Sequence, residues 1–352
     1  MRLSCFALLL GISSCLLSQE APETGVKNII LMIGDGMGMD HVFAAYTASH
    51  GNLNLMKSSF TGFSKTSSAN NYTTDSGAGA TAISGGQKTA NYSIGVDVSG
   101  NPLKSILISA EENGLSTGLV ATSSITHATP AAFIASVRNR SDEVEIAAGF
   151  IGSGIDIFIG GGRKYFENEK INVSDSLRKQ GYSIVYSLED IGTEGNGNIG
   201  CLVAPEALPP KHKGRDDYLP KATEAALEKL SKNDKGFFLM VEGSQIDWGG
   251  HANDIDYVIS EVIDFDKAVG KAFEFADKNP GTLVIVTADH ETGGLAITEG
   301  DIKAGSVKPD FTSKNHTPVF VPVYTYGEGA DNFSGIYENA EIYHKMMKAF
   351  GF

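Results

Sequence analysis

Three apolar segments of this chain each run directly into an acidic residue. These residues are Asp35, which lies in the glycine-rich turn Gly34-Asp35-Gly36, Glu242 and Asp289. Carboxylates that converge on one place repel one another unless cations neutralise them. The pattern therefore predicts a site that binds cations.

Histidines accompany these carboxylates at spacings that suit a metal ion. Asp247 and His251 are four residues apart, so on a helical turn they share one face and can hold the same ion. His290 directly follows Asp289, and His316 precedes the last long apolar segment. Imidazole combined with carboxylate suits Zn²⁺.

Glu242 and Thr129 offer only oxygen donors, which suits Mg²⁺. Taken singly, each of these residues has an ordinary explanation, because an Asp after a strand often caps a helix and a lone His is often a core or surface residue. Taken together, at the ends of successive apolar segments, they support one another and indicate a metal centre.

Ser76 is the candidate nucleophile. It follows a short polar segment and begins a run of small residues that is typical of a helix, so it is expected at or near a helix N-terminus. Unpaired N–H groups and the helix dipole stabilise an anion there. The alternative is that Ser76 only caps its helix. Because the chain shows no Gly-x-Ser-x-Gly elbow at this position, a nucleophilic Ser76 would need activation by a metal.

Arg138 and Arg140 are candidates for binding a phosphate group. A guanidinium fork can hold two non-bridging phosphate oxygens at once. The alternative is a pair of surface residues that form ion pairs with Asp142 and Glu143.

The elements that must position these residues alternate between strand and helix. Apolar runs that look like buried parallel strands cover residues 28–33, 116–121, 156–160, 237–241, 282–287 and 319–324. Helical spacing of apolar residues covers 103–113, 130–137, 220–231 and 254–277, whereas 192–217 and 298–316 look like loops. This alternation predicts an α/β fold, a three-layer α/β/α sandwich with a mostly parallel central sheet. Ligands of such sheets bind beyond the carboxyl ends of the strands, where the candidate residues lie.

The N-terminus predicts export. Residues 1–14 combine Arg2 with a short apolar run that is too brief to span a bilayer, and Ile12-Ser13-Ser14-Cys15 resembles a bacterial lipoprotein signal that is cut before a lipidated Cys15. The alternative is ordinary signal cleavage. We expect a tether over 15–27, one catalytic domain over 28–352, and a periplasmic, outer-membrane or cell-surface location.

Composition limits the partners of the protein. With 352 residues, 41% of them hydrophobic, the chain is neither disordered nor a small disulfide-stapled domain. Its formal net charge of −14 argues against nucleic acid as a specific partner.

Together these residues resemble the alkaline phosphatase family from about residue 28 to the C-terminus. Six motifs occur in the order of that family, and an ordered set of this size is very specific. They are Gly34-Asp35-Gly36, Thr74-Asp75-Ser76, His127-Ala128-Thr129-Pro130, the segment from Glu242 through His251, Asp289-His290-Glu291-Thr292-Gly293-Gly294, and His316-Thr317.

The resemblance implies a phosphoric monoester hydrolase that forms a phospho-Ser76 intermediate with two Zn²⁺ and one Mg²⁺. It implies a small-molecule phosphate monoester as substrate, Arg140 rather than Arg138 as the phosphate-binding arginine, and a homodimer, which is common in the family. The ligand set that it implies is Asp247, His251 and His316 for the first zinc, Asp35, Asp289, His290 and the Ser76 alkoxide for the second, and Asp35, Thr129 and Glu242 for magnesium.

Two positions depart from the best-known enterobacterial pattern. His127 stands where that enzyme has Asp, and Trp248 stands where it has Lys, a pair that resembles some marine and cold-environment bacterial members. We expect both near the substrate, with His127 linked to the third site through water or favouring zinc there. Trp248 removes a cation near bound phosphate, so we expect weaker binding of the phosphate product.

Other functions remain as alternatives. A sulfatase would need a Cys or Ser in a Cys/Ser-x-Pro-x-Arg setting, which Ser76 lacks. A phosphodiesterase of the same superfamily would leave Glu242, Thr129 and Arg140 without a purpose. A lipid-anchored protein that binds metal or phosphate without turnover would not need Ser76.

Overall fold

The computed structural model describes residues 25–168, 171–193 and 197–352. The predicted signal at 1–14, the lipidated Cys15 and the first ten residues of the tether therefore lie outside the described residues. Within the described ranges, no helix is both long and apolar enough to cross a membrane.

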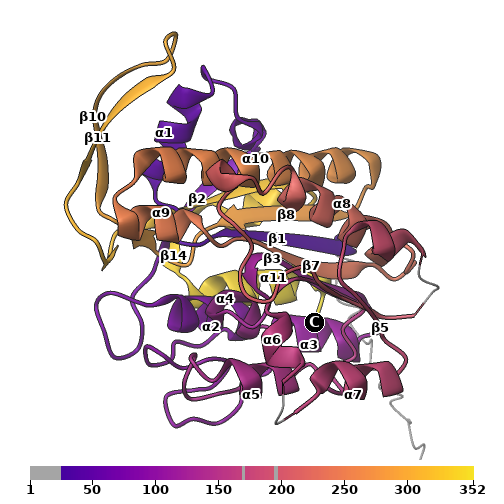
Figure 1. Ribbon diagram of the computed structural model, residues 1–352. Helices are drawn as coiled ribbons and strands as arrows, with labels where there is room; N and C mark the ends of the chain where they lie inside the picture. The colour runs from indigo at the N-terminus through magenta and orange to yellow at the C-terminus, as the bar shows by residue number, and fades with distance from the viewer. Residues whose placement is uncertain (1–24, 169–170, 194–196) are drawn as a thin grey trace, which may run out of the picture.

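A single large sheet runs through the centre of the described chain (Figure 1). Its ten strands lie in the order β14-β2-β13-β8-β1-β7-β3-β4-β6-β5. Within this described sheet, β13 is antiparallel to both of its neighbours and the other pairs are parallel. The strands are β1 (Asn28–Gly34), β2 (Phe60–Lys65), β3 (Ser116–Ser124), β4 (Ile157–Gly161), β5 (Ser183–Val185), β6 (Ile199–Leu202), β7 (Phe237–Gly243), β8 (Thr282–Thr287), β13 (Val321–Gly327) and β14 (Gly335–Glu338).

Helices cover both faces of this sheet, as Figure 1 shows. One face carries α1 (Met39–Ala48), α8 (Tyr218–Leu230), α9 (Ile246–Ala252) and the long α10 (Ile255–Lys278). The other face carries α2 (Ser76–Gly85), α3 (Ile106–Glu112), α4 (Ala128–Ala131), α5 (Glu143–Ala148), α6 (Arg163–Phe166), α7 (Val173–Lys179) and α11 (Ala340–Phe350). The architecture is therefore the predicted three-layer α/β/α sandwich.

Strand β1 shows why the central strands read as unbroken apolar runs. Ile29, Leu31 and Ile33 point into the core on the side of α2 and α3, whereas Ile30 and Met32 point into the core on the side of α10. Side chains alternate between the two faces of a strand, so a strand covered on both faces must be apolar at every position.

The prediction of a parallel strand over 319–324 is wrong in direction. The segment forms β13, which begins at Val321 and runs antiparallel to β8 and β2. The reason is the location of His316. This residue lies at the carboxyl edge of the sheet beside the other candidate ligands, so a strand that starts a few residues later at the same edge must run in the opposite direction.

Three other expectations also need correction. The helix predicted over 130–137 is only the short α4, after which Val137 pairs with Ile94 in an antiparallel bridge. The loop predicted over 298–316 contains most of a hairpin, which projects beside α1 in Figure 1. The hairpin consists of β10 (Leu295–Asp301) and β11 (Ser306–Phe311). The loop predicted over 192–217 contains the short strand β6.

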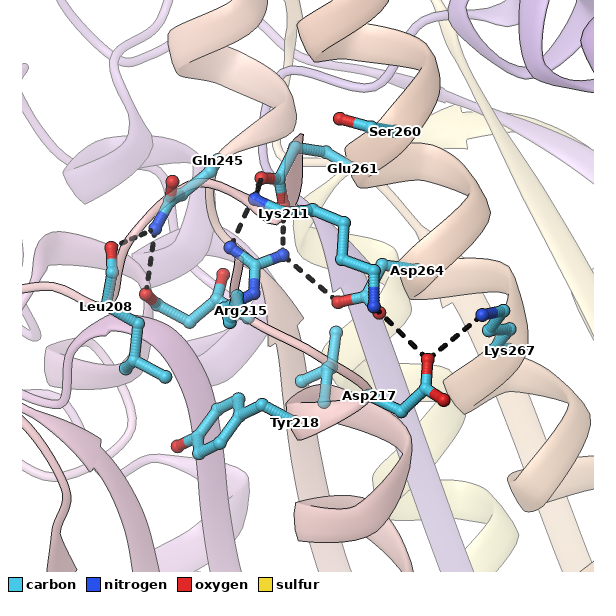
Figure 2. Close-up of polar contacts among 12 residues, drawn as sticks. Leu208, Lys211, Arg215, Asp217, Tyr218, Gln245, Ser260, Glu261, Asp264 and Lys267 are labelled. Atoms are coloured by element: carbon cyan, nitrogen blue, oxygen red, sulfur yellow. Dashed lines mark hydrogen bonds and ion pairs between the residues drawn. The ribbon is translucent and has the colours of Figure 1, made fainter. Parts of the chain in front are cut away.

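A buried ion cluster ties the segment before α8 to helix α10 (Figure 2). The Arg215 guanidinium donates to both carboxylate oxygens of Glu261 and, at 3.0 Å, to Oδ2 of Asp264. Lys211 Nζ lies 2.9 Å from Oδ1 of Asp264. The side chains of Arg215, Glu261 and Asp264 are at most 1% exposed. We call these four residues the Arg215 cluster.

Candidate active site

The candidate residues converge because four neighbouring strands are parallel. Strands β8, β1, β7 and β3 are adjacent in the sheet, so their carboxyl ends meet at one edge. Asp289, Asp35 and Glu242 follow or end three of these strands, and all three are fully buried. Burial raises the pKa of Asp35 well above its usual range, and the neighbouring carboxylates of Asp289, Asp247 and Glu242 raise it further. Cations would offset this repulsion.

Gly36 allows the turn after β1 to pack closely against Thr292 and Asp247. It has a φ of +73°, in the region that favours glycine. A Cβ atom at this position would lie 2.7 Å from Oγ1 of Thr292 and 2.8 Å from Cα of Asp247. A side chain here would therefore push the turn after β1 away from α9.

The first ligand group consists of Asp247, His251 and His316, whose ligand atoms lie within 4.8 Å of one another. Oδ1 of Asp247 is 3.4 Å from Nε2 of His251 and 3.5 Å from Nε2 of His316. Nδ1 of His251 lies 2.5 Å from the carbonyl oxygen of Lys314, and Nδ1 of His316 lies 2.9 Å from that of Thr74. Because a carbonyl oxygen only accepts, each Nδ1 carries the proton and each Nε2 is free to bind a metal.

The second ligand group surrounds His290. Nε2 of His290 lies 3.4 Å from Oδ1 of Asp35 and 3.4 Å from Oδ2 of Asp289. Ligand atoms of Asp35, Asp247 and His290 lie within 4.8 Å of one another, so Asp247 faces both groups. Burial and the neighbouring His316 lower the pKa of His290 well below its usual range, which keeps the imidazole neutral. A neutral imidazole is the form that binds metals.

Ser76 is the first residue of α2, as expected from the sequence. Its Oγ lies 3.2 Å from Nε2 of His290. Asp75 caps the helix, because its Oδ1 accepts the N–H of Ala78 at 3.0 Å. Gly79 allows α2 to approach closely, since a Cβ atom there would lie 3.0 Å from the carbonyl oxygen of Asp289. The small residues after Ser76 therefore bring its hydroxyl to the second ligand group.

The third group lies on the other side of Asp35. Ligand atoms of Asp35, His127 and Glu242 lie within 4.8 Å of one another. Burial raises the pKa of Glu242 to about 7. Burial, together with the charge of Arg140, lowers the pKa of His127 to about 3. The His127 ring stands 6.2 Å from the Trp248 ring, centroid to centroid, so these two residues are neighbours at this group.

The two candidate arginines, Arg140 and Arg138, make different contacts. Arg140 Nη1 lies 3.0 Å from Oδ2 of Asp75, next to the Ser76 nucleophile candidate. Arg138 is exposed and donates to the carbonyl oxygen of Ser99 at 2.8 Å. The geometry therefore favours Arg140 as the residue that contacts a ligand at Ser76.

Sequence reasoning assigned no role to Asp75 or Thr292. Asp75 both caps α2 and holds Arg140, and Oγ1 of Thr292 donates to Oδ1 of Asp247 at 2.5 Å. The signal for Asp75 was its location just before a run of small helical residues, which is typical of a helix cap. The contact of Thr292 joins two segments that are distant in sequence, so the sequence alone carried no signal for it.

The polar atoms at this edge fit metal ions. Buried atoms that lack a hydrogen-bond partner within the described chain include both carboxylate oxygens of Asp35, Oδ2 of Asp289, Oε1 of Glu242, Oγ1 of Thr129 and Nδ1 of His127. Buried polar atoms rarely stay unpaired, and all of these atoms are metal-binding types. An edge of this kind, with a serine hydroxyl beside it, has the residue types of a metal-dependent hydrolase site.

Comparison with known proteins specifies the class further. The sequence profile of the alkaline phosphatase family matches residues 26–309. Alkaline phosphatase 4 of Bacillus subtilis is 36% identical over 94% of this chain and 76% of its own length. Alkaline phosphatase of Escherichia coli is 31% identical over 97% of this chain and 90% of its own length. The solved structure of alkaline phosphatase from the Antarctic bacterium TAB5 is 42% identical, with a TM-score of 0.88 over 93% of this chain and 98% of that one. The chain belongs to the alkaline phosphatase family, and it is a phosphatase.

Proposed function

We propose that this phosphatase hydrolyses phosphate monoesters through a phospho-Ser76 intermediate, with two Zn²⁺ and one Mg²⁺. The observation that carries the proposal is the location of the Ser76 hydroxyl, 3.2 Å from Nε2 of His290 at the N-terminus of α2. Arg140 lies beside it, held by Asp75. A nucleophile, metal-binding groups and a phosphate-binding arginine thus share one site.

The metals would be held by the three groups of ligand atoms. Asp247, His251 and His316 would hold the first zinc. Asp35, Asp289 and His290 would hold the second zinc together with the Ser76 oxygen. Asp35, Thr129 and Glu242 would hold Mg²⁺, with the nitrogen of His127 close by. A variant of the TAB5 alkaline phosphatase, in which one His is replaced by Asp, has Mg bound in its M3 site.

The residues of the chain would act in a fixed order. The Arg140 fork would hold two non-bridging phosphate oxygens while Ser76 Oγ, after losing its proton to water, attacks phosphorus. The bond from phosphorus to the ester oxygen would break on the opposite side, and this oxygen would take a proton from water and leave as the alcohol. Bound zinc would supply Lewis acidity, which lowers the pKa of the hydroxyl and of water and neutralises developing charge. Water would then attack phospho-Ser76 from the side that the alcohol left, returning free Ser76 and inorganic phosphate.

We also propose a homodimer. In support, Met39 and Phe43 of α1 are 42% and 47% exposed, and Val319 and Phe320 before β13 are 49% and 50% exposed. Large apolar side chains that gather on one surface often mark an interface. Light scattering coupled to size exclusion would give the mass of two chains, and the mass of one chain would reject this proposal.

We further propose export to the periplasm or cell surface with a lipid on Cys15. The support is the sequence of residues 1–15. Mass spectrometry of the protein purified from bacterial membranes would show a diacylglyceryl-modified Cys15. A soluble mature protein with an unmodified N-terminus would instead indicate ordinary signal cleavage.

Hydrolysis of p-nitrophenyl phosphate tests the enzymatic proposal. At alkaline pH with Zn²⁺ and Mg²⁺, we expect fast turnover of the monoester, and Ser76→Ala and chelation should each abolish it. Acid quenching of the wild type should trap a phosphate on the Ser76 peptide. Preference for the bis-ester would move the protein to the diesterase branch. Binding of metals without turnover of either ester would support a binding protein.

A further inference from the structure

The two oxygens of the Glu242 carboxylate have different surroundings. Oε2 lies 2.6 Å from Oγ of Ser244 and 3.3 Å from Oγ of Ser123. Oε1 has no hydrogen-bond partner among the described residues. Because Glu242 is fully buried, this difference is set by the protein and not by solvent.

The proton of the Ser244 hydroxyl can be placed by counting donors. A serine hydroxyl has one proton to donate, and an ionised carboxylate only accepts. Oγ of Ser244 accepts the backbone N–H of Ser123 at 3.1 Å and lies 3.0 Å from Oγ of Ser123, but its shortest contact is the one to the charged Glu242 carboxylate. Its proton therefore points at Oε2 of Glu242. The hydroxyl of Ser123, which also lies 3.0 Å from the carbonyl oxygen of Ser124, contributes a longer and weaker contact.

Hydrogen bonds also hold the backbone around Ser244 in place. Its N–H donates to Oγ1 of Thr122 at 3.0 Å. The next residue, Gln245, donates from Nε2 to the carbonyl oxygens of Thr122 and Leu208, the second of which is drawn in Figure 2. Tyr257 donates its hydroxyl proton to Oε1 of Gln245 at 2.7 Å. The turn that carries Ser244 is thus tied to the end of β3 and to α10.

This arrangement leaves one oxygen of Glu242 for a cation. Mg²⁺ demands compact octahedral geometry, whereas Ca²⁺ accepts more oxygen ligands and often binds both oxygens of a carboxylate. A carboxylate whose second oxygen is held by a serine proton is suited to contribute a single oxygen. Rotation that would bring both oxygens to one ion would break the 2.6 Å contact to Ser244.

We propose that Ser244 is a positioning residue that holds Glu242 in the single-oxygen mode and thereby makes the third cation site select Mg²⁺ over Ca²⁺. The inference rests on the proposed magnesium site. It extends that site by one residue that does not contact the cation itself.

Calorimetric titration of the full chain tests this selectivity. The protein, stripped of metals and reloaded with two equivalents of Zn²⁺, would be titrated with Mg²⁺ and separately with Ca²⁺. In Ser244→Ala we expect the Kd for Mg²⁺ to rise roughly tenfold and the Kd for Ca²⁺ to change much less, because loss of a group that orients a metal ligand typically costs 10- to 100-fold in affinity. Ser123→Ala is the matched control, and it should change the ratio of the two constants much less.

Further variants separate selectivity from loss of structure. Ser244→Cys fills the same space with a somewhat larger group that donates only weakly, so it should shift the ratio of constants in the same direction as Ser244→Ala. Glu242→Ala should remove the heat of Mg²⁺ binding and so identify the site. An equal loss of both ions, or no change of either, in Ser244→Ala would overturn the inference and leave the magnesium site intact. A wild type that binds no Mg²⁺ would overturn the proposed magnesium site and the inference with it.

Discussion

The Arg215 cluster allows a sharp test of what buried charge contributes to the stability of this fold. Replacing Arg215 by Met keeps a long side chain but removes the cation that faces Glu261 and Asp264. Both carboxylates would then stay buried, and Lys211 would be the remaining cation of the Arg215 cluster. Breaking a buried ion pair by removing one partner typically costs about 3–5 kcal/mol. Because Lys211 still contacts Asp264 at 2.9 Å, we expect the lower end, about 3 kcal/mol.

Urea unfolding at alkaline pH would measure this loss. The fluorescence of Trp248, the single tryptophan of the chain, and far-ultraviolet circular dichroism would report on the site and on the fold. At this chain length, a loss of 3 kcal/mol corresponds to a decrease in Tm of roughly 4–5 °C. The control is Arg178→Met, whose ion pair with Asp175 has side chains that are 41% and 55% exposed, and it should cost less than about 1 kcal/mol.

The loss of stability in Arg215→Met should depend on pH, and the direction of this dependence can be predicted. Burial already raises the pKa of Glu261 in the wild type, and loss of the Arg215 charge would raise it further. A carboxyl whose pKa is higher in the folded state stabilises the fold at acid pH and loses this contribution as the pH rises. The cost of Arg215→Met should therefore be smaller at mildly acid than at alkaline pH, and adding Glu261→Met should recover part of it. A cost no larger than that of Arg178→Met, or one independent of pH, would refute the reasoning.

Three further predictions concern the site and one distant carboxyl group. Asp75→Ala should cost about 1 kcal/mol of stability by removing a helix cap. It should also raise the phosphate inhibition constant severalfold by releasing Arg140, and an unchanged constant would show that Asp75 does not orient Arg140. Trp248→Lys should lower the phosphate inhibition constant by adding a cation near bound product, an idea that an unaltered constant would contradict. Burial raises the pKa of Glu111 from its usual 4.5 to about 7, so its contribution to stability is full below pH 4.5 and is lost as the pH rises to about 7. Glu111→Gln should remove that slope and, after discounting for partial exposure, stabilise the protein at alkaline pH by about 1 kcal/mol. Denaturant titrations across this pH range would check the slope, and parallel curves for the two proteins would contradict it.

The fold could be predicted from the sequence where burial on both faces leaves a continuous apolar run. The run over 28–33 agrees with β1 because α10 covers one face of this strand and α2 and α3 cover the other. The hairpin of β10 and β11 was missed because it projects from the body with both faces largely exposed, so its residues carry no apolar pattern. The segment 130–137 was predicted as helix because its apolar residues have helical spacing, but the helix ends at Ala131. The residues that follow, Ala132 to Ala135, are all buried, and burial of every residue also suits irregular backbone.

The candidate site was largely predictable because its residues follow strands that end at one edge. Asp35, Glu242 and Asp289 could be placed together from that rule alone. The direction of β13 could also have been inferred, since His316 had already been placed at the same edge. The contacts that orient the ligands, such as those of Thr292 and Ser244, depend on how side chains pack across segments and therefore needed coordinates.

The order of the ligands along the chain has a consequence for biogenesis. Asp35 lies near the beginning of the described chain and His316 near its end, and the first and second ligand groups meet at Asp247. A chain that ends before His316 lacks one ligand of the first group, so it cannot assemble both groups. Occupation of both groups would therefore require synthesis to continue past His316, and bound metal would then stabilise the folded chain by mass action. The full set of metals would be retained by chains in which the first ligand, Asp35, and the last, His316, have been brought together by folding.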